Sequence, residues 1–352
     1  MTSKTKRNNL HLVEIPKELF DKYVEKKHPE ANFLQSSTWG EVYELTRVKT
    51  FLFGLTESTT SPRLTDLQGV ALAILKTAKR GRYLEVPGGP LIDWSGDFAT
   101  LQIFIDSVRA VAEKNHCVFV RMRPNIPDTP ANRAIVKKLK LRRSPMHLHA
   151  EHTVMLDLEQ SDEELLTAMR RQTRYDVRKA DKLGIKVDWA DSEKAFRDFY
   201  KLHSETAKRQ GFIPSSRRFI LAQHQAFGDL ARIYTARYQD RILAQGLILL
   251  RFPEAIYHEA ASGDEGRKYP GAAALQWQVI KDAKQLGLKR YNLFGIAPPN
   301  SPNHRYAGVT TFKTGFGGKQ IAYLPAHDLV VKPIHYQFVH LLETIRKKHR
   351  RL

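Results

Sequence analysis

Strand-like and helix-like segments alternate along this chain, and that alternation limits its possible folds more than any other feature. Short runs rich in β-branched and aromatic residues are followed by segments with apolar residues at helical spacing. Residues 101–114 have this spacing and lead into an apolar run at 118–122, which is typical of a buried strand. Such alternation is typical of the α/β class with mixed sheets.

The order of elements in the first half recurs in the second, which predicts two similar lobes. A length of 352 residues suits two domains that each bury a core. We place residues 1–150 in the first domain and 151–319 in the second, with 320–352 completing the first. A C-terminal helix is expected at 334–345, and its apolar positions would pack on the first lobe: Ile334, Phe338, Leu341, Leu342 and Ile345.

Periodicity and turn residues give the other expected elements. Further strands are predicted at residues 11–15, 50–55, 69–76, 82–86, 152–158, 185–189, 231–238, 241–251, 255–261 and 291–294. One further helix is predicted to begin at Pro16, and four others are predicted at residues 131–139, 162–183, 193–209 and 272–286.

The charge balance favours anionic partners. Lys and Arg outnumber Asp and Glu by 57 to 37, a formal net charge of +20, as in proteins that bind nucleic acid, phosphorylated metabolites or acidic membranes. The single cysteine, Cys117, lies in an apolar run and is predicted to be a core residue. No signal peptide or membrane-spanning run is visible, so a cytoplasmic location is expected.

The segment 291–318 carries the strongest chemical signal. A strand ends at Gly295, and further on Lys313 follows Phe312 and precedes a run with three glycines. An ammonium beside exposed backbone N–H groups suits a phosphate or a developing oxyanion. The alternative is a β-hairpin with an exposed lysine.

Three further groups of cations are candidate anion sites. Lys268 precedes the turn Pro270-Gly271 that opens a helix, and a helix N-terminus attracts anions, although an ordinary glycine-started helix is the alternative. The predicted helix 162–183 carries Arg170, Arg174, Arg178 and Lys182 at four-residue steps, where like charges destabilise a helix unless a phosphate chain or solvent covers them.

Arg209 lies near a predicted glycine C-cap at Gly211, where a guanidinium suits a diphosphate or stabilises the helix end. One of Ser36, Ser37 and Thr38 is expected to cap the helix that carries Trp39 and Tyr43. His147, His149 and His152 alternate on a predicted strand and are interpreted as surface or edge residues. No nucleophilic triad, zinc-ligand spacing or P-loop is found, so neither a metal nor a cofactor is predicted.

In this order, the motifs resemble the Fem family of peptidoglycan peptidyltransferases (FemABX). The resemblance covers nearly the whole chain and rests on these segments: Phe33-Leu-Gln-Ser with Trp39, Pro87-Gly-Gly-Pro, Arg178-Lys-Ala, Glu205-Thr with Arg209 and Phe212, Tyr257 with Ala261, Tyr291-Asn-Leu-Phe-Gly-Ile, and Phe312-Lys-Thr-Gly-Phe-Gly.

The resemblance implies two GNAT-like domains in tandem and transfer of an amino acid from aminoacyl-tRNA to the stem-peptide amine of a nucleotide-linked or lipid-linked peptidoglycan precursor. It implies that Lys313 stabilises the oxyanion or the tRNA end, with Phe312 beside it. Arg209 would contact the acceptor diphosphate, and Tyr257 would line the peptide channel. Trp39 and Tyr43 are further substrate candidates, and Arg170, Arg174, Arg178 and Lys268 are candidates for tRNA binding.

The chain departs from the family pattern at two positions. Tyr43 stands where some members carry a lysine, and Arg123 stands where some carry an acid. Residues 212–229 are also too few for the long helical arm of some relatives, which indicates the compact type.

Two other functions stay open. One is an acyl-CoA-dependent N-acyltransferase, favoured by the Lys268 turn, and the other is a non-enzymatic RNA-binding protein, favoured by the net charge. In addition, the basic run at 346–351 offers a peripheral contact with the inner face of a membrane.

Overall fold

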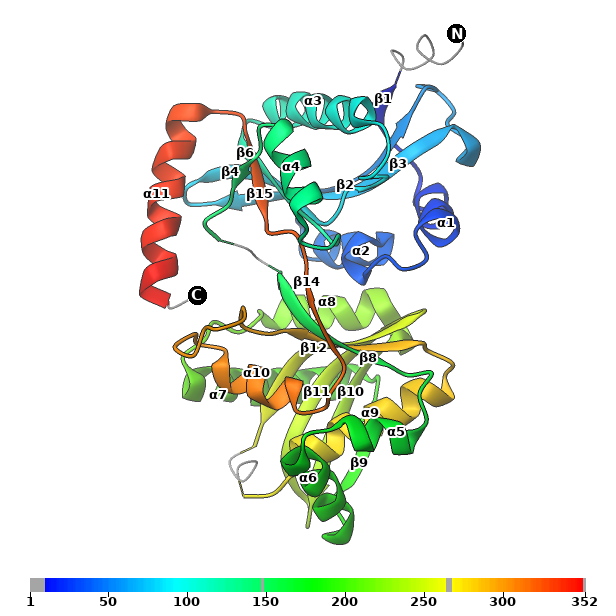
Figure 1. Cartoon of the computed structure of the whole chain (residues 1–352), viewed down its shortest axis with the longest axis vertical. Coiled ribbons are helices and arrows are strands. Elements are labelled where there is room, and N and C mark those ends of the chain that lie inside the picture. Colours follow the sequence, from blue (N-terminus) through cyan, green and yellow to red (C-terminus); the bar gives the residue numbers. More distant parts are fainter. Residues whose placement is uncertain (1–9, 147–148, 264–267, 351–352) are drawn as a thin grey trace. The chain divides into compact units, whose positions relative to one another are not determined.

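The computed structural model describes residues 10–146, 149–263 and 268–350. The chain divides into two compact units, Met1–Glu151 with Ala322–Leu352, and His152–Ile321. Each unit is built on a mixed sheet with helices packed against it (Figure 1). The predicted α/β class with mixed sheets is therefore confirmed.

The first unit contains an eight-stranded sheet in the order β1-β2-β3-β4-β6-β15-β7, with β5 paired to β3. Its strands are β1 (His11–Glu14), β2 (Thr50–Thr56), β3 (Leu67–Ala78), β4 (Gly81–Gly88), β5 (Leu91–Ile92), β6 (Cys117–Pro124), β7 (Arg142–Arg143) and β15 (His327–Val330). Its helices are α1 (Lys17–Lys27), α2 (Ser37–Leu45), α3 (Phe98–Lys114), α4 (Pro130–Lys138) and α11 (Pro333–Arg350), with the short helices η1 (Phe33–Gln35) and η2 (Leu64–Asp66).

The second unit contains a seven-stranded sheet in the order β14-β8-β13-β12-β11-β10-β9. Its strands are β8 (His152–Asp157), β9 (Lys186–Ala190), β10 (Ala231–Tyr238), β11 (Arg241–Arg251), β12 (Glu254–Ser262), β13 (Arg290–Gly295) and β14 (Lys319–Ala322). Its helices are α5 (Asp162–Ala168), α6 (Arg171–Lys182), α7 (Glu193–Gln210), α8 (Arg217–Phe227), α9 (Gly271–Gln285) and α10 (Ala307–Thr314), with the short helix η3 (Gly228–Leu230).

Both units repeat one arrangement of strands. In the first, the antiparallel strands β2, β3 and β4 are followed by α3, which leads to β6, parallel to β4. In the second, the antiparallel strands β10, β11 and β12 are followed by α9, which leads to β13, parallel to β12. The recurrence that the sequence suggests is present in the topology.

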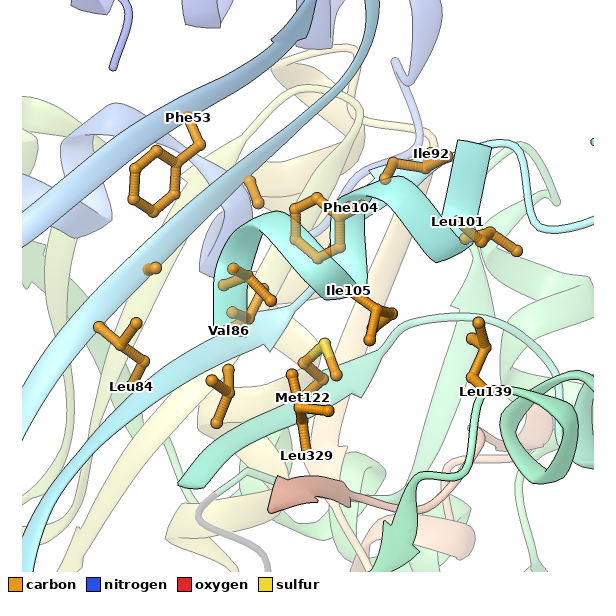
Figure 2. Close-up of a cluster of buried hydrophobic side chains, with 14 of the residues drawn as sticks. Phe53, Leu84, Val86, Ile92, Leu101, Phe104, Ile105, Met122, Leu139 and Leu329 are labelled. Atoms are coloured by element: carbon orange, nitrogen blue, oxygen red, sulfur yellow. The ribbon is translucent and has the colours of Figure 1, made fainter. Parts of the chain in front are cut away.

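The core of the first unit lies between α3 and the sheet (Figure 2). Leu101, Phe104 and Ile105 of α3 are buried in one cluster with Val86 of β4 and Met122 of β6. Cys117 is buried in the same cluster, and burial raises the pKa of its thiol to about 11. The prediction that Cys117 is a core residue is confirmed.

The prediction of one long basic helix at 162–183 is wrong, because the segment forms two separate helices, α5 and α6. The chain is extended at Met169, and the N–H of Arg170 bonds to the carbonyl of Gly315 at 2.9 Å instead of continuing the helix. Arg174 donates to the Thr167 carbonyl at 3.0 Å, so it caps the end of α5. The apolar spacing continues across the break, which is why the sequence did not reveal it.

Two other elements differ from expectation. The segment around Lys313 is the helix α10, so the hairpin alternative is wrong. Threonine hydroxyls on α10 bond back to the preceding turn, for example Thr314 to the Thr310 carbonyl at 2.8 Å, which accommodates β-branched residues in a helix. The helix α8 was not predicted, and it occupies the region that is too short for a long arm.

The C-terminal helix α11 packs on the first unit, but not through the predicted face. Its buried residues are Tyr336, Val339 and Glu343. Tyr336 and Val339 join Val118 and Phe119 in a small apolar cluster. Most of the expected contact residues lie on the opposite side, where Ile334 is 89% exposed. In the described part of the chain, no helix has the length and apolar character needed to cross a bilayer.

Candidate active site at a split between parallel strands

The parallel strands of the second unit separate at their carboxyl ends. Pairing runs from Glu254 with Arg290 to Ile256 with Asn292, after which β12 continues to Ser262 without β13. In the first unit, by contrast, β4 and β6 stay paired through Gly88 and Pro124. The registers of β12 with β11 and of β13 with β8 are both irregular near this point. Bulges bend strands, so the split follows from these irregularities. In open α/β sheets ligands bind beyond the carboxyl ends of the strands, which makes this end of β12 and β13 a candidate site.

Lys313 lies at this split. Its side chain is buried, and Nζ donates a 2.9 Å hydrogen bond to the carbonyl oxygen of Gly295, the last residue of β13. The same Nζ lies 5.7 Å from the centre of the Tyr257 ring on β12. Burial lowers the pKa of Lys313 to about 7, so the amine can donate or accept a proton near neutral pH.

A buried polar network fixes the carbonyl that Lys313 contacts. Asn292 accepts from the backbone N–H of Phe294 at 2.9 Å and donates to Glu254 at 3.0 Å. Thr153 of β8 donates to the same Asn292 oxygen at 2.5 Å. Phe294 adopts a left-handed backbone with φ of 59°, which costs about 1–3 kcal/mol for a residue with a Cβ. The network therefore holds a strained turn beside Lys313.

Tyr257 and Phe312 complete the immediate surroundings of Lys313. Tyr257 is 9% exposed, and burial raises the pKa of its phenol, which therefore stays neutral at physiological pH. Phe312 precedes Lys313 on α10 and packs edge-on against Phe316, with ring centres 5.2 Å apart. Of the predicted site residues, the structure thus brings Lys313, Phe312 and Tyr257 together.

The glycines after Lys313 serve packing. A Cβ at Gly315 would lie 2.3 Å from Oγ1 of Thr173 on α6, and one at Gly317 would lie 2.8 Å from the Ala168 carbonyl. The expectation that this turn lets the backbone approach a ligand is therefore wrong at these two positions, because protein atoms occupy the space.

A buried acid–histidine pair near the site was missed in the sequence. Glu259 Oε2 on β12 lies 3.2 Å from His203 Nε2 on α7, and Ser215 donates to Glu259 Oε1 at 3.0 Å. Burial raises the pKa of Glu259, and the imidazole partly offsets the shift. The two residues lie far apart in the chain, so no local spacing could reveal the pair.

Arg209 lies at the exposed end of α7, which ends at the predicted C-cap, Gly211, with φ of 71°. Its guanidinium donates to the carbonyl of Ser262, the last residue of β12, and lies 3.3 Å from the Ser262 hydroxyl. Arg209 therefore holds the free end of the same strand that carries Tyr257.

The other cations of this unit are more dispersed than predicted. Arg170 and Arg178 are exposed, whereas Arg174 is half-buried and caps α5 as described. Lys268 is exposed at the entry to α9. At that entry the N–H of Gly271 bonds to the Tyr269 carbonyl at 2.9 Å, and a Cβ would lie 2.4 Å from Cβ of Leu243. The glycine at this turn therefore permits close packing on β11.

Trp39 and Tyr43 belong to the first unit. Trp39 is 1% exposed and packs edge-on with Phe33 and Tyr43 at ring distances of 4.8 and 5.6 Å. The helix cap is Ser36, whose hydroxyl accepts from the Trp39 N–H at 3.1 Å, as the sequence suggested. Lys76 Nζ lies 3.7 Å from the centre of the Tyr43 ring.

A buried charged cluster lies beside Tyr43. Lys76 is 3.6 Å from Glu85, and His149 Nε2 is 3.1 Å from Glu85 Oε1. Burial raises the pKa of Glu85, but Lys76 and His149 together lower it to about 2. The interpretation of His149 as a surface residue is wrong, because Glu85 draws its imidazole inward; His152 is half-buried, and His147 lies outside the described residues.

Arg123 on β6 is buried close to this cluster. Burial lowers the pKa of Arg123 to about 10, and its Nε and Nη1 have no hydrogen-bond partner within the described ranges. Two residues earlier, Arg121 bonds to Asp328 at 2.8 and 2.9 Å and to Glu343 at 2.8 Å. In the described segments, no group of three or more His, Cys, Asp or Glu residues could hold a metal ion.

Curated proteins similar to this chain include two staphylococcal aminoacyltransferases. Aminoacyltransferase FemA of Staphylococcus epidermidis is 25% identical over 157 residues, 45% of this chain and 37% of that protein. Aminoacyltransferase FemA of Staphylococcus aureus is 25% identical over 145 residues, 41% of this chain and 34% of that protein. The chain thus matches little more than a third of the length of these relatives.

Solved structures show the same fold. A crystal structure of FemX superposes with a TM-score of 0.79 at 17% identity, covering 94% of this chain and 100% of that one. A tandem GNAT protein from the clavulanic acid biosynthesis pathway superposes with a TM-score of 0.54 at 13% identity, covering 92% and 98%. The predicted pair of GNAT-like folds is confirmed.

The FemAB family model matches residues 15–139, 140–239 and 229–344. These segments include the split strands, Lys313 and every described strand of both sheets except β1. The chain belongs to the FemAB family.

Proposed function

We propose that this protein transfers an amino acid from aminoacyl-tRNA to the stem-peptide amine of a peptidoglycan precursor. The observation that carries the proposal is the buried Lys313 at the split between β12 and β13. The relatives named as aminoacyltransferases and the resemblance of the motifs support it. In this proposal the protein has two domains, residues 151–319 and residues 1–150 completed by 320–352. The split between β12 and β13 lies in the domain formed by residues 151–319.

The proposed reaction needs no covalent enzyme intermediate. The acceptor amine attacks the ester carbonyl of the aminoacyl-tRNA, a C–N bond forms, and the C–O bond to the tRNA ribose breaks. The proton lost by the amine ends on the ribose hydroxyl, directly or through water. Alignment of the two substrates supplies several kcal/mol and up to about 7–11 kcal/mol in favourable cases.

In this proposal, Lys313 stabilises the oxyanion. Its pKa of about 7 leaves the amine partly protonated at neutral pH, and a negative charge nearby favours the protonated form. A charged donor in a buried site loses little to solvent screening, and one such donor is typically worth about 3–4 kcal/mol. Phe312 would pack beside the tRNA end, and Tyr257 would line the path of the acceptor peptide.

The remaining assignments concern binding. Arg209, which lies at the exposed end of α7 and donates to the Ser262 carbonyl, would contact the acceptor diphosphate. Arg170, Arg174, Arg178 and Lys268 would contact tRNA phosphates. Tyr43 would line an acceptor site in the first unit, where Lys76 places a cation on its ring, and the buried Trp39 would position Tyr43 by edge-on packing at 5.6 Å.

The proposal is tested by incubating the protein with a mixture of charged tRNAs and a nucleotide-linked pentapeptide, followed by mass spectrometry of the peptide. A gain of one amino-acid residue is expected, and its mass identifies the donor. Uncharged tRNA should give no product. If coenzyme A thioesters yield product and charged tRNAs do not, the protein is an acyl-CoA transferase instead.

A substitution separates catalysis from folding. Lys313→Met should lower kcat/KM about 10²–10³-fold, the effect of removing one oxyanion donor. The matched control is Lys319→Met, which removes an exposed lysine from β14 and should leave the rate unchanged. Wild-type turnover by the Lys313→Met variant would refute the proposed role.

A further inference from the structure

The outer side of α11 carries a stripe of large apolar residues. Ile334, Phe338, Leu341 and Ile345, here named the α11 stripe, are 89%, 60%, 58% and 58% exposed. At about 100° per residue these four positions fall within an arc of about 60° on the helix surface. Single exposed apolar residues are common on proteins, whereas four in one row mark an interaction surface.

The opposite side of α11 already fixes the helix on the first unit. Tyr336 packs edge-on against Phe119 at 5.6 Å, and its hydroxyl donates to Asp328 at 2.9 Å. Glu343 accepts from Arg121 at 2.8 Å and lies 3.6 Å from Arg80. Because the buried contacts of α11 are made by this side, the α11 stripe is not needed to hold the helix on the sheet.

The charges of α11 are distributed unevenly. Its single carboxylate, Glu343, is buried in an ion pair, so the exposed surface of the helix carries no negative side chain. Its last described turn contains Lys347, Lys348, His349 and Arg350. Lys348 and His349 flank the α11 stripe on the helix surface, given about 100° per residue.

We propose that the α11 stripe docks the protein on an anionic lipid surface. A helix with one apolar face and nearby lysines and arginines lies in the interface of a bilayer, with the apolar side chains among the acyl chains. Each Lys or Arg near such a surface strengthens binding about fivefold, from about 1 kcal/mol of attraction to anionic headgroups. The α11 stripe supplies the apolar face, and the basic turn at residues 347–350 supplies the cations.

Charge and chemistry disfavour two other occupants. A second copy of this chain would bring another helix with the same cationic end, and an RNA would have little use for three exposed aliphatic side chains. The inference goes beyond the proposed transferase activity and does not depend on it. Membrane docking and transfer to a nucleotide-linked acceptor can therefore fail or succeed separately.

The test is flotation of the full-length protein with vesicles of phosphatidylcholine alone or mixed with phosphatidylglycerol. The wild type should float with the mixed vesicles and not with the neutral ones. The variant Phe338→Ser/Leu341→Ser should lose at least about tenfold in affinity, because interfacial binding scales with the buried apolar area. The variant Lys348→Gln should lose about fivefold, because it removes one charge beside the stripe.

A matched control removes two exposed leucines from the second unit. The variant Leu230→Ser/Leu286→Ser loses side chains that are 47% and 49% exposed, and it should float like the wild type. The stripe variant should keep the wild-type unfolding midpoint and its rate with a nucleotide-linked acceptor, because its two side chains face away from the core.

Three outcomes would overturn the proposal. One is a wild type that does not float with phosphatidylglycerol vesicles, and another is a stripe variant that floats as well as the wild type. The third is a wild-type dimer that the stripe variant converts to a monomer, which would assign the α11 stripe to a second copy. Likewise, a lysine variant that floats like the wild type and binds an RNA oligonucleotide more weakly would assign the basic turn to RNA and refute its membrane role.

Discussion

Lys313 Nζ lies 2.9 Å from the Gly295 carbonyl oxygen, and in the described part of the chain no carboxylate forms an ion pair with it. A carbonyl offers only a partial charge, so it satisfies one N–H of the ammonium without neutralising it. Burial is accordingly the cause of the lowered pKa of Lys313. The residue is a cation held in an unfavourable environment beside a strained turn, which is typical of a functional site.

The first prediction concerns stability. The pKa of Lys313 falls from 10.5 to about 7 on folding, so between these values the unfolded state binds more protons and stability rises with pH. Below about pH 7 the full cost of the buried charge is present. Lys313→Met should therefore stabilise the protein by about 2–4 kcal/mol near pH 6, after allowing for the lost hydrogen bond.

Urea unfolding of the wild type and of the Lys313→Met variant measures this difference. The gap between the two proteins should shrink as the pH rises from about 7 to about 10, since the wild type regains stability as the lysine loses its proton. A pH-independent gap would show that Lys313 is solvated in the folded protein.

The second prediction concerns the pH dependence of transfer. If protonated Lys313 stabilises the oxyanion, its contribution to kcat/KM falls about tenfold per pH unit above about 7. The substrate amine titrates equally in both proteins, so the ratio of kcat/KM in the wild type to that in the Lys313→Met variant isolates the lysine. A ratio that rises with pH would instead identify Lys313 as the general base.

The regular elements were largely predictable from the sequence. Period-two strands and amphipathic helices such as α3 follow from local patterns, because one face of each is buried in the core. The split between β12 and β13 depends on register irregularities with two other strands, and the Glu259–His203 pair joins distant segments. No local pattern reports either feature.

The α11 helix shows why an apolar pattern can mislead. Ile334, Phe338, Leu341 and Ile345 have the spacing of a core-facing stripe, but the buried side contains Glu343. The sheet presents Arg121, whose buried charge requires a carboxylate, and this pairing selects the polar side of the helix. Periodicity identifies an apolar face and cannot tell whether a core or another apolar surface covers it.

The third prediction compares two buried arginines on β6. Arg121→Met should destabilise the protein by about 3–5 kcal/mol, because it leaves Asp328 as an uncompensated buried charge and Glu343 with only the longer Arg80 contact at 3.6 Å. Arg123→Met should cost less than about 1 kcal/mol or stabilise the protein, because Nε and Nη1 of Arg123 have no hydrogen-bond partner in the described segments. Chemical denaturation measures both, and similar losses for the two variants would contradict the assignment.

The fourth prediction distinguishes a packing glycine from a ligand-binding glycine at the start of α9. A Cβ at Gly271 would lie 2.4 Å from Cβ of Leu243, which is too near the backbone of β11 to move aside. Gly271→Ala should therefore cost about 1–3 kcal/mol of unfolding free energy, since α9 must shift from the sheet. Gly308→Ala is the matched control, because a Cβ there meets no atom within 4 Å and alanine favours the helix α10 by up to about 1 kcal/mol. If Gly271→Ala leaves the unfolding free energy intact and abolishes activity with a coenzyme A thioester, the turn binds a ligand and the packing account is wrong.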